Sequence, residues 1–379
     1  MGLLTGSLPD FPWDTLVPFA ERARAHPDGI VDLSVGTPVD PTPPLLRDAL
    51  TAASDAHGYP TTHGTLELRE AVVRWFARRR GVPGLDPAAV LPTVGSKELV
   101  AFLPALLGLG DGDVVLHPAA AYPTYDVGAR LAGATPEPCD DPAARLADEG
   151  VRLVWLNSPG NPDGSVLSVE QLRDVVAAAR AASERDGKPV VVASDECYAE
   201  LAWDEPWVSD CIPSILDPRV TGGDLTGLLA VYSLSKQSNL AGYRAAFVAG
   251  DPALVGALLE VRKHAGLIVP APVQAAMVVA LDDDEHVAEQ RERYARRRAV
   301  LRSALEGAGY AVDASSAGLY LWTRPEAGGQ DSWATVADLA ELGILVAPGA
   351  FYGDDQHVRI ALTASDERIA TAAARLSGA

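Results

Sequence analysis

The chain has 379 residues, more than one hydrophobic core usually supports, so we expect two domains that share an interior. Its formal net charge is −20 at pH 7 and its basic runs are short, which disfavours nucleic-acid binding. Three cysteines without CxxC spacing and seven histidines without an HExxH pair favour a reducing cytoplasm and no metal site.

The first residues do not combine a basic segment with a continuous apolar stretch, so we expect no signal peptide. The longest apolar run, 265–281, is interrupted by Pro270 and Pro272 and is shorter than the roughly 20 residues of a membrane span. We interpret this run as a buried loop that enters a helix. We expect a cytoplasmic protein that does not bind membranes.

The N-terminal part combines a helix over 13–26 with an extended segment over 30–44, whose prolines exclude a central strand. We expect this arm to pack with the C-terminal part. From about residue 86 to 264, short β-branched runs alternate with helical segments, which is typical of a mostly parallel sheet covered on both faces. Strands are expected at 114–118, 152–157, 189–196, 228–235 and 245–250, and helices at 96–108 and 168–187, the second capped by Ser168.

The pattern changes after Pro272 and becomes typical of a smaller α+β domain. A long charged helix is expected over 285–309, followed by strands at 317–322, 343–348 and 357–362 and a helix over 331–343. We therefore predict an α/β fold with a large domain over 46–264 and a small domain built from 1–45 and 265–379. The interface between them is suited to a cleft.

A lysine follows one of the predicted buried strands. The segment AVYSLSKQSNLAGYR carries Lys236, the hydroxyls of Ser233 and Ser235, and Arg244. Ligands gather at the carboxyl ends of parallel strands, where this amine can form an imine with a phosphorylated aldehyde while the hydroxyls and the guanidinium bind the phosphate. Taken alone, the segment fits an exposed loop lysine and a surface arginine equally well.

Asp195 ends the apolar strand of PVVVASDECYAEL, where an unpaired carboxylate is costly. A protonated pyridine nitrogen is a suitable partner, because the paired ring then acts as an electron sink for a substrate carbanion. Tyr198 follows three residues later and can reach a phenolic oxygen of the same ring. The alternative is a helix N-cap aspartate beside a core tyrosine.

Three further segments fit the same ligand. Asn161 in WLNSPGNPDG can donate a hydrogen bond to the phenolic oxygen. Ser96 and Lys97 in PTVGSKELVAF begin a helix whose free amides attract a phosphate, and Tyr122 in AAAYPTYDVG can stack on the ring. The ordinary alternatives are a turn, a capped helix, and core packing of Tyr122 and Tyr125.

The segments NSPGNPDG, SDECYAEL and SLSKQSNLAGYR, in this order and spacing, make the chain resemble the class I and II aminotransferases of pyridoxal 5'-phosphate (PLP) fold type I. The likeness runs from LSVGTPVDPTPP to HVRIAL, nearly the whole chain. Structural explanations account for each motif separately but not for their joint order. The resemblance implies PLP as cofactor.

The resemblance also assigns roles around PLP. Lys236 would form the internal aldimine, a Schiff base, and move the proton between the substrate Cα and the cofactor C4'. Asp195 would pair with the pyridine nitrogen, while Tyr198 and Asn161 would bond the phenolic oxygen. Tyr122 would stack on the ring, and the phosphate would be bound by the amides of Ser96 and Lys97 together with Ser233, Ser235 and Arg244.

Two further roles concern the substrate and the assembly. Arg359 in HVRIAL would bind the substrate α-carboxylate with its planar fork, aided by the backbone near Gly36. The alternative is an arginine that snorkels from an edge strand. Tyr59 would reach the phosphate bound by the neighbouring subunit, which implies a homodimer.

Within the family, segments such as FPWDTL, DLSVGTPVDP and VRKHAGLIVPAPVQAAM most resemble the succinyldiaminopimelate transaminases of lysine biosynthesis. The likeness implies ping-pong transfer of an amino group between N-succinyl-LL-2,6-diaminopimelate and 2-oxoglutarate. We expect Lys263 and His264 to meet the distal carboxylates at the rim of the cleft, although a solvated helix end explains them as well. Asp163 departs from the usual threonine of NPTG, which affects loop detail.

Other functions share the same cofactor residues. The alternatives are an aminotransferase for aspartate or an aromatic amino acid and a PLP-dependent C–S lyase. A more remote alternative is a PLP-binding transcriptional regulator, which requires an added helix-turn-helix domain that this sequence does not show.

Overall fold

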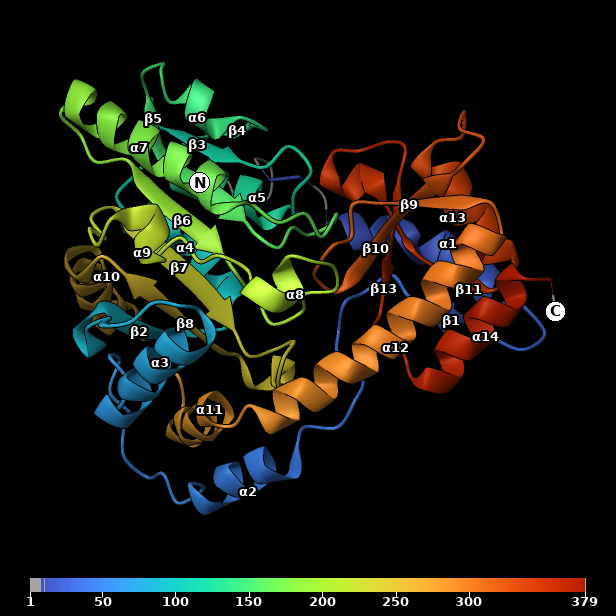
Figure 1. The fold of residues 1–379 in the computed structure, drawn as a ribbon, viewed down its shortest axis with the longest axis horizontal. Coiled ribbons are helices and arrows are strands. Elements are labelled where there is room, and N and C mark those ends of the chain that lie inside the picture. The colour runs from blue at the N-terminus through green and yellow to red at the C-terminus, as the bar shows by residue number, and fades with distance from the viewer. Residues whose placement is uncertain (1–7, 10, 379) are drawn as a thin grey trace, which may run out of the picture.

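The computed structural model describes residues 8–9 and 11–378, which form a large domain on a seven-stranded sheet and a smaller domain beside it (Figure 1). The strand order is β2-β8-β7-β6-β5-β3-β4; β8 is antiparallel to both neighbours and the other pairs are parallel. This confirms the mostly parallel sheet. Its strands are β2 (Val90–Val94), β3 (Val114–His117), β4 (Thr135–Pro138), β5 (Val151–Asn157), β6 (Val191–Asp195), β7 (Leu228–Ser233) and β8 (Ala245–Gly250).

The five strands expected in this domain are all present, whereas β2 and β4 are not among the expected strands. Pro136 and Pro138 lie within β4. Proline has no backbone N–H and therefore cannot donate the hydrogen bonds that a central strand makes to its neighbours. The strand is possible because β4 is the edge of the sheet and pairs with β3 alone.

Successive residues of the central strands are buried on opposite faces, which explains why these strands are apolar throughout. In β6, Val191 packs with the cluster that includes α4, α5 and α10, and Val192 packs with the cluster that includes α3, α7 and α11. Ser168 caps α7 in a capping box, as predicted. The large-domain helices are α2 (Pro44–Ala52), α3 (Leu66–Arg79), α4 (Ser96–Leu106), α5 (Thr124–Ala132), α6 (Pro142–Arg145), α7 (Val169–Asp186), α8 (Trp207–Asp210), α9 (Pro218–Thr221), α10 (Pro252–Ala265) and α11 (Ala271–Asp282), with short 3-10 turns at Pro87–Ala89 and Ala241–Tyr243.

The small domain has a four-stranded antiparallel sheet in the order β12-β13-β10-β9. The strand expected at 343–348 is divided: β11 pairs with the arm strand β1, and β12 pairs with β13, because the chain changes partner at the buried Val346. The elements are β1 (Val31–Asp32), β9 (Tyr310–Asp313), β10 (Tyr320–Pro325), β11 (Ile344–Leu345), β12 (Ala347–Pro348), β13 (Val358–Ala361), α1 (Val17–Arg24), α12 (Glu285–Gly307), α13 (Ser332–Glu341) and α14 (Asp366–Leu376), with 3-10 turns at Pro12–Leu16 and Gly349–Tyr352.

The domain boundary differs from the expected one. Helix α11 packs against α2 and α3 and buries Met277 and Leu281 in the large-domain core. The boundary at 264/265 is therefore too early, and the chain passes into the small domain along α12, which spans both domains in Figure 1. An almost uniformly apolar helix such as α11 does not indicate by its sequence which core it joins.

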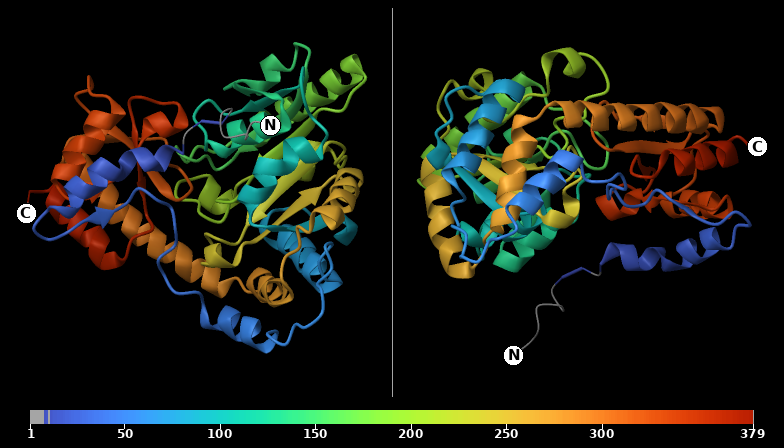
Figure 2. Two further views of the ribbon diagram at one scale, coloured as in Figure 1. Left: turned by 180° about the vertical axis from the view of Figure 1, so that it is seen from behind. Right: turned by 90° about the horizontal axis from the view of Figure 1, so that it is seen from below.

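The N-terminal arm joins the two domains a second time. Helix α1 packs on α13, β1 pairs with β11, and the extended segment then crosses to α2 on the large domain (Figure 2). This confirms that the arm packs with the C-terminal part. No helix among the described residues is both long enough and apolar enough to cross a bilayer.

Candidate active site

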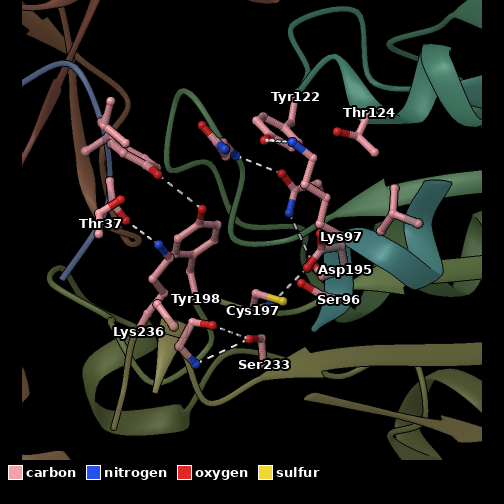
Figure 3. Close-up of a pocket in the computed structure, with 18 of the residues that line it drawn as sticks. Thr37, Ser96, Lys97, Tyr122, Thr124, Asp195, Cys197, Tyr198, Ser233 and Lys236 are labelled. Carbon is pink, nitrogen blue, oxygen red and sulfur yellow. Dashed lines mark hydrogen bonds between the residues drawn. The ribbon is translucent and has the colours of Figure 1, made fainter. Parts of the chain in front are cut away.

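A cavity of about 280 Å³ opens where the carboxyl ends of the large-domain strands face the arm and the small domain. Figure 3 shows the side chains that converge there from strand ends, from the start of α4 and from the arm. Most of the site residues expected from the sequence line this cavity, namely Gly36, Ser96, Lys97, Tyr122, Asn161, Asp195, Tyr198, Ser233, Ser235, Lys236, Arg244 and Arg359.

Lys236 lies in the turn that follows β7, and its amine donates a hydrogen bond to the carbonyl of Gly36 in the arm. Burial lowers the pKa of Lys236 below its ordinary value of 10.5, and the positive charges of Arg359 and Arg244 act in the same direction. Both effects favour the neutral amine, which is the form that attacks an aldehyde.

Asp195 ends β6 as a mostly buried carboxyl group without a cationic partner among the described residues. Tyr125 donates its hydroxyl to Oδ2 at 3.0 Å, and the backbone N–H of Cys197 donates to Oδ1 at 3.2 Å. Burial raises the pKa of Asp195, and the hydrogen bonds from Cys197 and Tyr125 offset this only in part. A ring N–H that carries positive charge would be a suitable partner for this carboxylate.

The start of α4 forms an anion cradle beside Lys236. Gly95 precedes Ser96 with φ of +76°, and a side chain at Gly95 would collide with the guanidinium of Arg244. The absence of that side chain lets Arg244 lie against the free amides of the helix N-terminus. Ser233 and Ser235 are hydrogen-bonded to each other at 2.8 Å in the same wall. Free amides, hydroxyls and a guanidinium together fit a phosphate.

Arg359 is 2% exposed and lies on β13, an inner strand of its sheet, so it does not snorkel from an edge. It donates to Oδ1 of Asn161 at 2.9 Å and to the carbonyl of Ser34 at 2.7 Å. Its guanidinium also lies 4.0 Å from the ring centre of Tyr320 and 4.8 Å from that of Tyr352. None of these partners neutralises its charge, which leaves the planar fork suited to a substrate carboxylate.

Three expected site residues lie elsewhere on the chain. Lys263 forms an exposed ion pair with Glu260 at 2.6 Å on α10, and the neighbouring His264 is exposed. Neither residue lines the cavity of its own chain. Tyr59 is fully exposed in the segment before α3.

Several residues that line the cavity are not predicted from the sequence, and four of them bear on its chemistry: Trp13, Tyr125, Cys197 and Tyr320. Tyr125 and Cys197 act on Asp195, whereas Trp13 and Tyr320 come from the arm and from β10. A buried tyrosine hydroxyl needs a partner, which is the signal that Tyr125 offered. The sequence alone did not identify Asp195, 70 positions away, as that partner.

Residues 28–376 match the family model described as aminotransferase class I and II. The chain belongs to this family.

Two relatives are similar along almost the whole chain. The 4-dedimethylamino-4-oxo-anhydrotetracycline transaminase OxyQ of Streptomyces rimosus is 60% identical over 98% of this chain and 99% of its own. The probable aminotransferase Rv1178 of Mycobacterium tuberculosis is 59% identical over 99% of this chain and 87% of its own. Among solved structures, a probable N-succinyldiaminopimelate aminotransferase from Thermus thermophilus superposes with a TM-score of 0.83 at 29% identity, covering 97% of this chain and 100% of that one.

The enzyme is a PLP-dependent aminotransferase, and the residues of the cavity fit this cofactor. PLP supplies an aldehyde and an electron-withdrawing ring, which let an amino group pass between amino acids and keto acids. The chain supplies a partly buried amine at Lys236, a carboxylate at Asp195, a group of anion-compatible donors at the start of α4, and a planar guanidinium at Arg359 that suits a carboxylate.

Proposed function

We propose that this aminotransferase moves an amino group between N-succinyl-LL-2,6-diaminopimelate and 2-oxoglutarate, with Lys236 as the cofactor-bearing lysine. Lys236 also serves as the base that moves the proton at the substrate Cα, because its amine lies inside the cavity beside Gly36. Arg359 binds the α-carboxylate. The enzyme functions as a homodimer in which Tyr59 extends to the phosphate bound by the second copy.

The observation that carries the substrate assignment is a cation in the cavity wall. The ammonium of Lys97 donates to the hydroxyl of Tyr122 at 3.0 Å and has no carboxylate partner within ion-pair distance among the described residues. The indole N–H of Trp13, which also lines the cavity, is buried without an acceptor. Among the described residues, a cation without a carboxylate partner and an indole N–H without an acceptor suit a substrate that has a carboxylate far from its reacting carbon.

Lys97 therefore replaces Lys263 and His264 as the group proposed to bind the distal carboxylate. The structure of the Thermus thermophilus protein, described as a probable N-succinyldiaminopimelate aminotransferase, supports this substrate class by its likeness. Glutamate, the donor of the second half-reaction, is shorter and depends less on the same contact.

A second candidate is the amination of a polycyclic ketone. It rests on the 60% identity to OxyQ, whose name gives 4-dedimethylamino-4-oxo-anhydrotetracycline as its substrate. The cavity mouth is also aromatic: the ring centre of Trp13 lies 6.2 Å from that of Tyr122 and 5.3 Å from that of Phe351. Such a wall suits the flat face of a fused ring system.

The test measures amino transfer by the purified enzyme with a panel of substrates. The amino donors in the panel are N-succinyl-LL-2,6-diaminopimelate, glutamate, aspartate, phenylalanine, alanine and a thioether amino acid. The panel also contains the ketone that appears in the name of OxyQ, tested as acceptor with glutamate as donor. The proposal expects the succinylated donor to give the highest kcat/KM with 2-oxoglutarate. Preferential turnover of the ketone would establish the second candidate in its place.

Lys97→Met and Lys263→Ala form a matched pair of lysine variants, one in the cavity wall and one on the surface. A hydrogen bond to a charged group contributes roughly 1.5 to 3 kcal/mol, so Lys97→Met should raise KM for the succinylated donor about tenfold or more. Alanine, which has no distal carboxylate, should be unaffected. Equal losses for both donors, or an effect of Lys263→Ala alone, would contradict the role of Lys97.

A further inference from the structure

Tyr320 lies on β10 and lines the cavity, although no expected role accounts for it. Its hydroxyl is 3.3 Å from the hydroxyl of Tyr198, and the two rings meet edge to face with centres 5.8 Å apart. Gly36 makes room for it, since a side chain at Gly36 would collide with the Tyr320 hydroxyl. The phenol is 4% exposed, so its polar atom depends on these contacts.

The direction of the hydrogen bond between the two tyrosines follows from the site. Either hydroxyl is able to donate at this distance. The proton of Tyr198 is required for the phenolic oxygen of the cofactor, which accepts hydrogen bonds. Tyr198 is therefore the acceptor from Tyr320, because each hydroxyl carries a single hydrogen.

The charges around Tyr320 make it a strong donor. Burial opposes its ionisation, but the positive charge of Arg359 and the hydrogen bond with Tyr198 lower the pKa of Tyr320 below its ordinary value. The guanidinium of Arg359 lies 4.0 Å from the ring centre. The positive charge of Arg359 also acts on the neighbouring Tyr352, although burial keeps the pKa of Tyr352 above its ordinary value.

We propose that Tyr320 is a positioning residue that donates its hydroxyl hydrogen to Tyr198 and so directs the Tyr198 hydroxyl toward the phenolic oxygen of the cofactor. A hydroxyl that accepts one hydrogen bond becomes a better donor of the next, so the pair works as a two-step chain. The inference is independent of the substrate proposal and rests on the assignment of Tyr198 to the phenolic oxygen.

The consequence is measurable without turnover. Hydrogen bonds to the phenolic oxygen favour its negative form and thereby weaken proton binding at the nitrogen that joins Lys236 to the cofactor. Losing the Tyr320 hydroxyl should raise the pH at which this nitrogen loses its proton. A neutral hydrogen bond of ordinary strength corresponds to an upward shift of about half a unit to one unit.

The experiment is a spectrophotometric pH titration of the visible absorbance of the holoenzyme and its variants. Tyr320→Phe should move the midpoint upward by about that half to one unit. Tyr352→Phe is the matched control, because its buried hydroxyl has no partner while its ring also lies near Arg359. The control should titrate with the wild type.

Two further variants separate the proposed chain from a loss of packing. Tyr198→Phe together with Tyr320→Phe should shift the midpoint no further than Tyr198→Phe alone, since Tyr320 acts through Tyr198. Gly36→Ala keeps the phenol but displaces its hydroxyl, and it should reproduce the upward shift. The proposal is overturned if Tyr320→Phe titrates like Tyr352→Phe, or if the shifts of the two tyrosine variants add in full.

Discussion

Replacing Asp195 with asparagine should stabilise the cofactor-free protein while weakening its binding of PLP. The carboxyl group is mostly buried at the end of β6, and its hydrogen-bond partners are the neutral groups of Tyr125 and Cys197. Burial raises the pKa of Asp195 above 3.8. Asparagine keeps the shape and the acceptor oxygen but carries no charge, so it removes the cost of burying the carboxylate.

The sign of the pH dependence follows from that pKa. A carboxyl group with a higher pKa in the folded chain than in the unfolded chain binds protons more readily when folded. The folded state then loses stability as the pH rises from the unfolded pKa through the folded one. Each unit of difference corresponds to about 1.4 kcal/mol at neutral pH. The advantage of Asp195→Asn should therefore be full at pH 7 and shrink on acidification below the folded pKa.

Cofactor binding should show the opposite effect. A lost hydrogen bond to a charged ring nitrogen costs roughly 1.5 to 3 kcal/mol, which raises the apparent Kd for PLP about tenfold or more. At the same PLP concentration, the gain in stability on adding PLP falls by about 1.4 kcal/mol for each tenfold change in Kd.

The assay is denaturant or thermal unfolding of each protein with and without PLP, at pH 7 and at lower pH. Asp217→Asn is a suitable control, because Asp217 is also buried but bonds Arg219 at 2.7 Å and caps α9. That variant should lose stability to the same extent with and without PLP. If Asp195→Asn behaves like Asp217→Asn, then Asp195 serves the fold and the reasoning is refuted.

Three other variants test other parts of the site. Gly95→Ala would strain a φ of +76° and push against Arg244. The apparent Kd for PLP, measured by titration, should therefore rise at least about tenfold. An unchanged Kd would contradict phosphate binding at the start of α4. Arg359→Lys loses the planar fork and should raise KM for every amino donor about tenfold or more in steady-state assays, whatever the side chain of the donor. An effect confined to one donor would contradict binding of the α-carboxylate by Arg359. Tyr59→Ala subunits mixed with Lys236→Ala subunits should regain activity, because one site of each mixed dimer is intact; no recovery would mean that Tyr59 serves its own chain.

The sequence predicts the strands of the large domain well because each is a short apolar run that ends at a polar residue. Asp195 and Lys236 stand at such ends, and parallel strands bring their carboxyl ends to one edge, so these residues could be placed together without a structure. The same logic does not apply to α11. Its apolar residues occur on all sides, and only packing against α2 and α3 assigns it to the large domain.

The parts of the site that sequence analysis missed depend on contacts between distant segments. Tyr125 and Tyr320 resemble ordinary core aromatics in the sequence, and their hydroxyls acquire a role only through Asp195 and Tyr198. Lys263 shows the reverse case. A cation near a domain boundary was predicted to face the cleft, but Glu260 one turn earlier on α10 pairs with it at the surface.

Chemical reduction of the holoenzyme followed by peptide mapping tests the central assignment most directly. Hydride reduction turns the link between the cofactor and its lysine into a stable bond, so the modified peptide identifies that lysine. The account predicts the modification on Lys236, in the turn after β7, and none in Lys236→Ala. Modification of Lys97 or Lys263 in the wild type would contradict the account.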